Sequence, residues 1–193
     1  MPYEERFKEL SRYVYYIDPK HEKYDSRIQE GKVIEMQELD YKILKIESNT
    51  VNGMQAMAVA PVKNNIVDTS EIIIAYAGTN IDDKLDIMTD IQTVILGNKD
   101  SLIKKERLGS TTTYVHVPYE SQIISAETFA ETIKDDYPHA TISTTGHSLG
   151  EYIALYIASE NGWKNVGFNG PDPYNILSEE AKDWIEANPG IVI

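Results

Sequence analysis

A hexapeptide in the last third of the chain carries the residues best suited to chemistry. Residues 145–150 read Thr-Gly-His-Ser-Leu-Gly, which is a G-x-S-x-G motif centred on Ser148. An alternating run rich in β-branched residues (140–145) precedes the motif, and a helix-forming run (151–158) follows it. Strand, sharp turn and helix in this order hold a serine hydroxyl on an exposed elbow. The pattern predicts that Ser148 is the nucleophile of a hydrolase.

The residues around Ser148 have separate expected roles. We expect glycine at 146 and 150 because the turn brings two backbone segments too close for a Cβ. His147 is interpreted as a structural part of the elbow, with its ring directed away from the hydroxyl. The N–H of Leu149 is placed at a helix N-terminus, where the helix dipole favours negative charge. Leu149 is therefore one expected donor to the oxyanion of an acyl-transfer reaction.

A second oxyanion donor is expected at the end of an earlier strand. The apolar run 71–77 ends at Gly78-Thr79-Asn80. Glycine allows close approach of the backbone, and Thr79 offers both an N–H and a hydroxyl. We interpret Thr79 as the second donor, and a plain tight turn is the alternative interpretation of the same residues.

The base that a serine nucleophile needs is missing from its expected place. Enzymes with this elbow carry serine, acid and histidine in that chain order, but His21, His116, His139 and His147 all precede Ser148. Asp172 follows Ser148, yet it lies between two prolines and is interpreted as a turn residue. The expectation is that acid and histidine lie beyond residue 193. The alternatives are that an earlier histidine substitutes, or that the protein is not catalytic as it stands.

The rest of the chain predicts the elements that position this motif. Spacings of three and four among apolar residues predict an amphipathic helix over 3–17. Strands are predicted at 41–47, 54–62, 71–77, 140–145 and 165–169, and a strand start at 191–193. Further helices are predicted at 82–96, at 120–137 and from Ser178, as N-cap, to about 187. The Thr-rich part of 97–118 is compatible with a pair of strands.

The order of these elements predicts the fold class. A hairpin followed by alternating strands and helices indicates an α/β fold with a mostly parallel central sheet and helices on both faces. The chain has 193 residues, so we expect a single domain. Within it, residues 1–40 form an N-terminal helical segment and residues 41–193 the core.

Composition excludes several classes of partner and site. The formal net charge of −13 argues against binding to nucleic acid or to anionic membrane surfaces. No run of eighteen apolar residues predicts a membrane span, and residues 1–8 contain no apolar signal segment, so a cytoplasmic location is expected. Cysteine is absent, and neither a metal cluster nor a phosphate-binding glycine loop is visible. We therefore expect no cofactor and no metal, and the sequence indicates no particular oligomeric state.

From about residue 54 to its end, the chain resembles the class 3 lipase family of α/β-hydrolases. The resemblance rests on four segments, 72–79, 86–90, 137–150 and 168–171. It implies an α/β-hydrolase core that lacks the last C-terminal elements, with Ser148 as nucleophile and Thr79 and Leu149 as oxyanion donors. It also implies hydrolysis of carboxylic esters of the lipid or acylglycerol type. Residues 82–96 would suit a lid, or an ordinary amphipathic helix.

Glu151 is the main departure from this family, which usually has a second glycine there. The segment 146–152 also resembles the malonyl-type acyltransferases, in which glutamate at that position is usual. The glutamine-rich loop of those enzymes is absent from the N-terminal part of this chain. Acyl transfer is therefore the alternative enzymatic hypothesis. A catalytically incomplete hydrolase-fold fragment that binds a ligand or partner is the non-enzymatic one.

Overall fold

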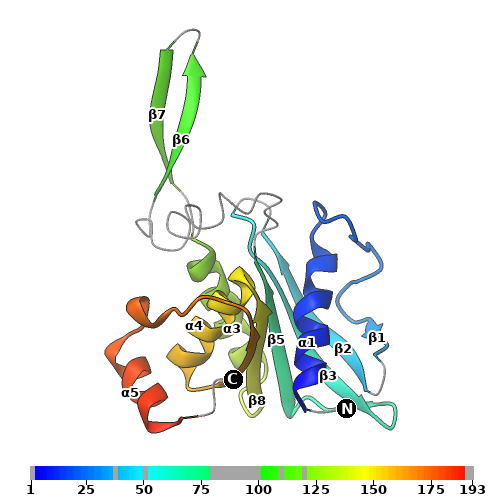
Figure 1. Cartoon of the computed structure of the whole chain (residues 1–193). Coiled ribbons are helices and arrows are strands. Elements are labelled where there is room, and N and C mark those ends of the chain that lie inside the picture. The colour runs from blue at the N-terminus through cyan, green and yellow to red at the C-terminus, as the bar shows by residue number, and fades with distance from the viewer. Residues whose placement is uncertain are drawn as a thin grey trace.

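The computed structural model describes residues 3–36, 39–49, 52–78, 101–108, 111–118 and 121–189, with the side chains of Tyr3, 101–108 and 111–118 left out of the description (Figure 1). The helix predicted at 82–96, the strand start at 191–193 and Thr79 lie outside the described residues. The predicted N-terminal helix is confirmed as α1 (Tyr3–Tyr13), which continues into the 3-10 helix η1 (Val14–Ile17). Its apolar stripe is buried, as the spacing predicts, and comprises Phe7, Leu10, Val14 and Ile17.

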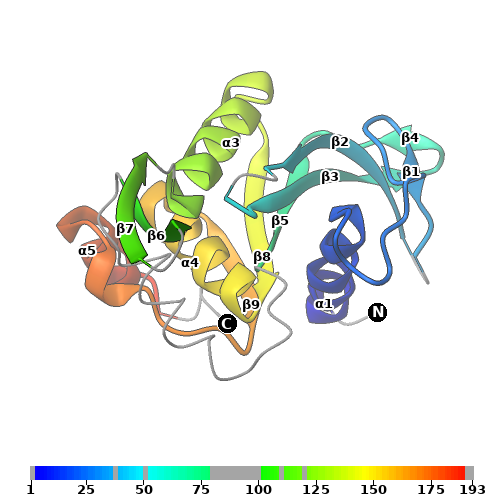
Figure 2. The same cartoon turned by 90° about the horizontal axis from the view of Figure 1, so that it is seen from above.

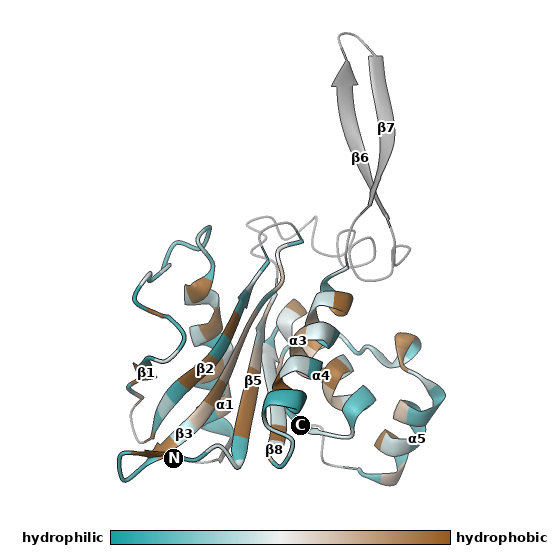
Figure 3. Ribbon diagram, turned by 180° about the vertical axis from the view of Figure 1, so that it is seen from behind, coloured by the Kyte–Doolittle hydropathy of each residue, from teal (hydrophilic) through white to brown (hydrophobic). Residues whose placement is uncertain are grey.

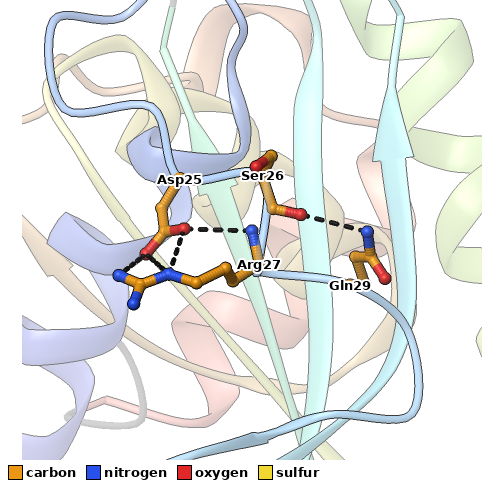
Figure 4. A network of polar contacts seen from close by, with 4 residues as sticks. All are labelled: Asp25, Ser26, Arg27 and Gln29. Atoms are coloured by element: carbon orange, nitrogen blue, oxygen red, sulfur yellow. Dashed lines mark hydrogen bonds and ion pairs between the residues drawn. The ribbon is translucent and has the colours of Figure 1, made fainter.

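Local polar contacts order the loop that follows η1. The Asp25 carboxylate accepts from the backbone N–H of Arg27 at 3.0 Å and from its guanidinium at 2.7–3.1 Å (Figure 4). The side-chain amide of Gln29 donates to the carbonyl of Ser26 at 3.0 Å. These bonds stay within one turn, so they shape the loop before β1 (Val33–Ile34) rather than hold it to the core.

The central sheet has seven strands in the order β1-β2-β3-β5-β8-β9, with β4 beside β3. Besides β1, its strands are β2 (Asp40–Ser48), β3 (Gln55–Lys63), β4 (Ile66–Val67), β5 (Glu71–Ala77), β8 (Thr141–His147) and β9 (Lys164–Phe168). Pairing is parallel from β5 to β8 and from β8 to β9, and antiparallel in the rest of this sheet.

The prediction of a mostly parallel sheet is wrong for the described residues, because the sheet is mixed. The connections between β2, β3, β4 and β5 are too short for the crossover that a parallel pair requires. β2, β4 and β5 therefore each pair antiparallel with β3. Only the strands on either side of α3 (Gln122–Asp136) and α4 (Leu149–Asn161) have room to run parallel.

Helices cover both faces of the sheet, as predicted (Figure 2). Side chains of β5 alternate between the two faces. Ile72, Ile74 and Tyr76 pack with α3, α4 and α5 (Glu179–Ala187), whereas Ile73, Ala75 and Ala77 pack with α1. Strands of the sheet carry much of the apolar colour in Figure 3. The strand 71–77 is thus buried on both sides, which explains its continuous apolar sequence.

Two other sequence predictions, a strand pair within 97–118 and the Ser178 cap, are confirmed. Residues 101–108 and 111–118 form the antiparallel strands β6 (Ser101–Leu108) and β7 (Thr111–Pro118) of a separate two-stranded sheet. The Ser178 hydroxyl accepts from the N–H of Ala181 at 3.1 Å and caps α5. Gly162, in the left-handed conformation, ends α4.

Parallel pairing brings the carboxyl ends of three strands to one edge of the sheet. Tyr76 of β5 lies opposite Gly146 of β8, and Gly146 lies opposite Gly167 of β9. Ligand sites of open α/β sheets form at this edge.

No helix among the described residues is long and apolar enough to cross a membrane.

Candidate active site

Ser148 lies between β8 and α4, in the strand–turn–helix setting expected from the motif. Its backbone has φ 56° and ψ −123°, a region that residues with a Cβ rarely occupy. Ser148 is the N-cap residue of α4, yet its side chain makes no capping hydrogen bond. The hydroxyl of an N-cap serine ordinarily accepts a hydrogen bond from a backbone N–H in the first turn of the helix. Here the hydroxyl of Ser148 makes no such bond, and the backbone of the residue is strained.

The two glycines of the motif are required by close backbone contacts. A Cβ added at Gly146 would lie 2.2 Å from the carbonyl oxygen of Gly150, and one added at Gly150 would lie 2.2 Å from the carbonyl oxygen of Tyr76. Both distances fall far inside van der Waals contact, and both involve backbone atoms that cannot rotate away. The elbow therefore packs directly on the end of β5.

The expected oxyanion donors are placed only in part. Leu149 is the first residue of α4, so its N–H has no acceptor within the helix. Gly78 follows β5 and approaches the same turn, since a Cβ added there would lie 2.8 Å from Cβ of Leu149. The position before Thr79 is thus beside the elbow, while Thr79 itself lies outside the described residues.

The segment after β9 fixes the elbow from its other side. The N–H of Ser148 donates to the carbonyl of Phe168 at 2.9 Å. Asn169, the next residue, also has a positive φ of 56°. Two strained residues thus lie in adjacent backbone segments at one edge of the sheet, a clustering typical of functional sites.

Tyr15 of η1 is a site residue that the sequence did not reveal. Its hydroxyl donates to the carbonyl of His147 at 3.0 Å and accepts from the N–H of Gly78 at 3.3 Å. Burial raises the pKa of this phenol, and the bond from Gly78 partly opposes the rise. One neutral hydroxyl therefore links the residue before the nucleophile to the residue before the expected oxyanion threonine.

Glu151 is buried beneath the elbow rather than exposed on the first turn of α4. Only 6% of its surface is exposed. Oε1 accepts from the side-chain amide of Asn165 at 2.7 Å, whereas Oε2 has no hydrogen-bond partner among the described residues. Burial raises the pKa of the carboxyl to about 8, although the Asn165 bond acts in the opposite direction. The group is therefore a neutral acid at pH 7.

The described histidines are distributed over two ends of the sheet. His147 is exposed and lines a pocket of about 300 Å³ together with His21, Tyr15 and Arg12. His139 precedes β8, a strand of seven residues, and is therefore more than ~20 Å from Ser148. The side chain of His116 is not described. Asp172 is exposed and accepts from the N–H of Tyr174 at 2.9 Å, as a turn residue does.

No group of three or more His, Asp or Glu side chains in the described part of the chain is arranged to hold a metal ion. The polar groups at this edge suit nucleophilic chemistry: a strained serine and a helix N-terminus.

Comparisons with known proteins return no family model and no curated protein that matches the chain. Among solved structures, the Rhizomucor miehei lipase propeptide complex is similar at 17% identity and a TM-score of 0.44, over 86% of this chain and 52% of that one. A mutant form of MDLA from Penicillium cyclopium is similar at 12% identity and a TM-score of 0.37, over 83% and 61%.

A fungal lipase–inhibitor complex is similar at 19% identity and a TM-score of 0.32, over 61% of this chain and 40% of that one. This chain thus spans between 40% and 61% of the length of these three solved chains.

Proposed function

We propose that the protein is a serine hydrolase of carboxylic esters, with lipid or acylglycerol-type esters as its substrate class. The observation that carries the proposal is the backbone of Ser148, at φ 56° and ψ −123° between β8 and α4. Strain of about 1–3 kcal/mol at one residue persists only where the surroundings enforce it. Here the surroundings enforce a conformation that presents a hydroxyl beside a helix N-terminus.

In the proposed reaction, Oγ of Ser148 attacks the ester carbonyl carbon and gives up its proton to a base. The N–H of Leu149 and the N–H or hydroxyl of Thr79 hold the negative oxygen of the tetrahedral intermediate. The alcohol then leaves with a proton from the conjugate acid of that base, and water releases the acyl group from Ser148. Charge at the oxyanion is favoured because the α4 dipole points its positive end at this position.

Enzymes with this elbow take their base from a histidine that follows the serine, and no histidine follows Ser148 in this sequence. The alternative is that an earlier histidine substitutes. Of the described histidines, His21 and His147 line the pocket beside the elbow. Replacement of His21 by asparagine tests that alternative, because loss of reactivity would identify His21 as the base and retention would exclude it.

Labelling with a fluorophosphonate tests the nucleophile directly. Intact-mass spectrometry should show one adduct on the wild-type protein, and peptide mapping should place it on Ser148. S148A should show none. Absence of an adduct from wild-type protein, or an adduct elsewhere, would overturn the assignment and favour the incomplete hydrolase-fold reading.

Turnover assays then separate the two enzymatic hypotheses. Release of p-nitrophenol from short-chain esters supports ester hydrolysis. Transfer from an acyl thioester to an acceptor thiol, without ester turnover, supports the acyltransferase alternative that the segment 146–152 resembles.

A further inference from the structure

The side chain of Glu151 occupies space that exists only because β9 and the following turn carry glycines. A Cβ added at Gly167 would lie 1.6 Å from the carboxyl carbon of Glu151, and one added at Gly170 would lie 2.4 Å from its Cβ and Cγ. The family that this sequence resembles usually has glycine at position 151. In this chain the large residue is on α4, and the small residues that accommodate it are on the opposing segment.

The segment that holds Glu151 also holds the nucleophile. The carbonyl of Phe168 accepts from the N–H of Ser148 at 2.9 Å, between the two glycines that contact the acid. A Cβ at Gly170 would also lie 2.8 Å from the carbonyl oxygen of Ser148. Displacement of Glu151 would therefore move the backbone that fixes Ser148 in its strained conformation.

A buried polar chain connects this acid to the rest of the sheet. The hydroxyl of Thr144 on β8 lies 2.8 Å from the side-chain oxygen of Asn165 on β9, and the amide nitrogen of Asn165 lies 2.7 Å from Oε1 of Glu151 on α4. Neither Thr144 nor Asn165 can carry a charge in the physiological range. No ionisable group of the described residues contributes to the pKa shift of Glu151. Among the described residues, no cation therefore compensates the ionised form of Glu151.

We propose that the protonated carboxyl group of Glu151 positions the Ser148 elbow, and that ionisation of this carboxyl displaces the elbow. The part that concerns reactivity rests on the proposed function. The structural part does not, because it concerns packing between α4 and residues 167–170. Glu151 is a positioning residue in this scheme and does not contact the substrate.

The direction of the pH effect follows from the two states of the chain. Glutamate in the unfolded chain loses its proton near pH 4.5, whereas burial in the folded chain raises the pKa to about 8. Between these values the unfolded state binds fewer protons than the folded state, so the free energy of unfolding falls as pH rises. Above about pH 8 both states are ionised and this contribution no longer changes.

E151Q tests the proposal because glutamine keeps the size and the carbonyl of the acid but cannot ionise. We would record the thermal unfolding midpoint from pH 5 to 9, hydrogen exchange of peptides covering 148–152 and 167–170, and the rate of fluorophosphonate labelling. In the wild type the unfolding midpoint should fall between about pH 5 and 8 and then level off, whereas exchange protection and the labelling rate should fall as the folded-state carboxyl ionises near pH 8. In E151Q these three quantities should not show the pH-dependent fall that ionisation of Glu151 causes in the wild type. E131Q, at an exposed position of α3, is the matched control and should follow the wild type.

Equal pH profiles of the unfolding midpoint and of exchange for wild type and E151Q would overturn the proposal, whatever the labelling shows. If no protein labels but the midpoint and exchange profiles still differ, the nucleophile assignment fails and the proton-dependent elbow stands. Should E151Q not fold, the wild type labelled with ¹³C-glutamate decides by NMR. One side-chain carboxyl titrating above pH 7 supports the proposal, and its absence refutes it.

Discussion

The hydroxyl of Tyr15 donates a hydrogen bond of 3.0 Å to the carbonyl of His147, the residue that precedes the candidate nucleophile. The same oxygen accepts from the N–H of Gly78 at 3.3 Å. A single phenol thus bridges the ends of β8 and β5 from outside the sheet. It sets the distance between the serine elbow and Gly78, the residue before the proposed oxyanion donor Thr79.

Replacement of Tyr15 by phenylalanine should separate these two strand ends. The change leaves one carbonyl and one N–H without their partner, so we expect a loss of about 1–2 kcal/mol in the free energy of unfolding. Labelling of Ser148 should slow by about tenfold, since misplacement of a reacting group has a large effect on rate. Urea unfolding and fluorophosphonate kinetics measure the two effects. Y16F is the control, because no described hydrogen bond uses its hydroxyl. Similar behaviour of Y15F and Y16F would contradict this role.

The backbone strain at Ser148 predicts that a glycine at this position increases the free energy of unfolding relative to alanine. Glycine at position 148 adopts φ 56° without a steric clash because it has no Cβ. Alanine has a Cβ and therefore retains the clash. Relief of about 1–3 kcal/mol of strain, less about 0.5–1 kcal/mol of extra unfolded-state entropy, should leave S148G about 1 kcal/mol more stable than S148A. Neither variant should label. Chemical denaturation of both proteins at one pH gives the difference, and a less stable S148G would argue against strain at this residue.

Gly150 should not tolerate a methyl group. Alanine is favoured over glycine within helices by about 1 kcal/mol, so propensity alone predicts that G150A stabilises α4. The contact of 2.2 Å between the new Cβ and the carbonyl oxygen of Tyr76 opposes this gain. Because the clash is with backbone, we expect net destabilisation of about 3 kcal/mol or more, or failure to fold. Circular dichroism on heating measures it, and a neutral or stabilising result would mean that the elbow and β5 lie further apart.

Asn165 should tune the titration of Glu151. The amide bond to Oε1 lowers the pKa of that carboxyl against the larger effect of burial. N165A removes the bond, so the pKa of Glu151 should rise further. The pH range over which the free energy of unfolding falls should then extend to higher pH. Loss of a buried partner should also lower the free energy of unfolding by about 1–3 kcal/mol. The ¹³C resonance of the Glu151 carboxyl reports the midpoint, and an unchanged or lower midpoint would show that Asn165 does not act on this acid.

The sequence predicts the elements of this fold well where the information is local. A continuous apolar run identifies β5 as a strand buried on both faces, and spacings of three and four identify α1 and its buried face. Strand direction is different, because it depends on how chain segments connect. The hairpin rule applied to residues 41–62 is correct, but its extension to β4 and β5 makes the sheet mixed rather than mostly parallel.

The candidate site is predicted only where its residues form a motif. Ser148 and its glycines stand within five positions of one another, whereas Tyr15 is 132 positions from His147. An aromatic residue after an amphipathic helix gives no sign that it bonds to a distant carbonyl. Glu151 misleads for another reason, since glutamate in the first turn of a helix usually faces water. Gly167 and Gly170 were the available signal that a large side chain occupies that space.

The contact between Tyr15 and His147, which are 132 positions apart, also affects how the protein folds. Contacts between residues so far apart in sequence form slowly, because loop-closure entropy is paid before they form. During refolding from urea, helical content should therefore return before Ser148 regains its reactivity. That lag would be the kinetic signature of the docking of η1 onto the sheet.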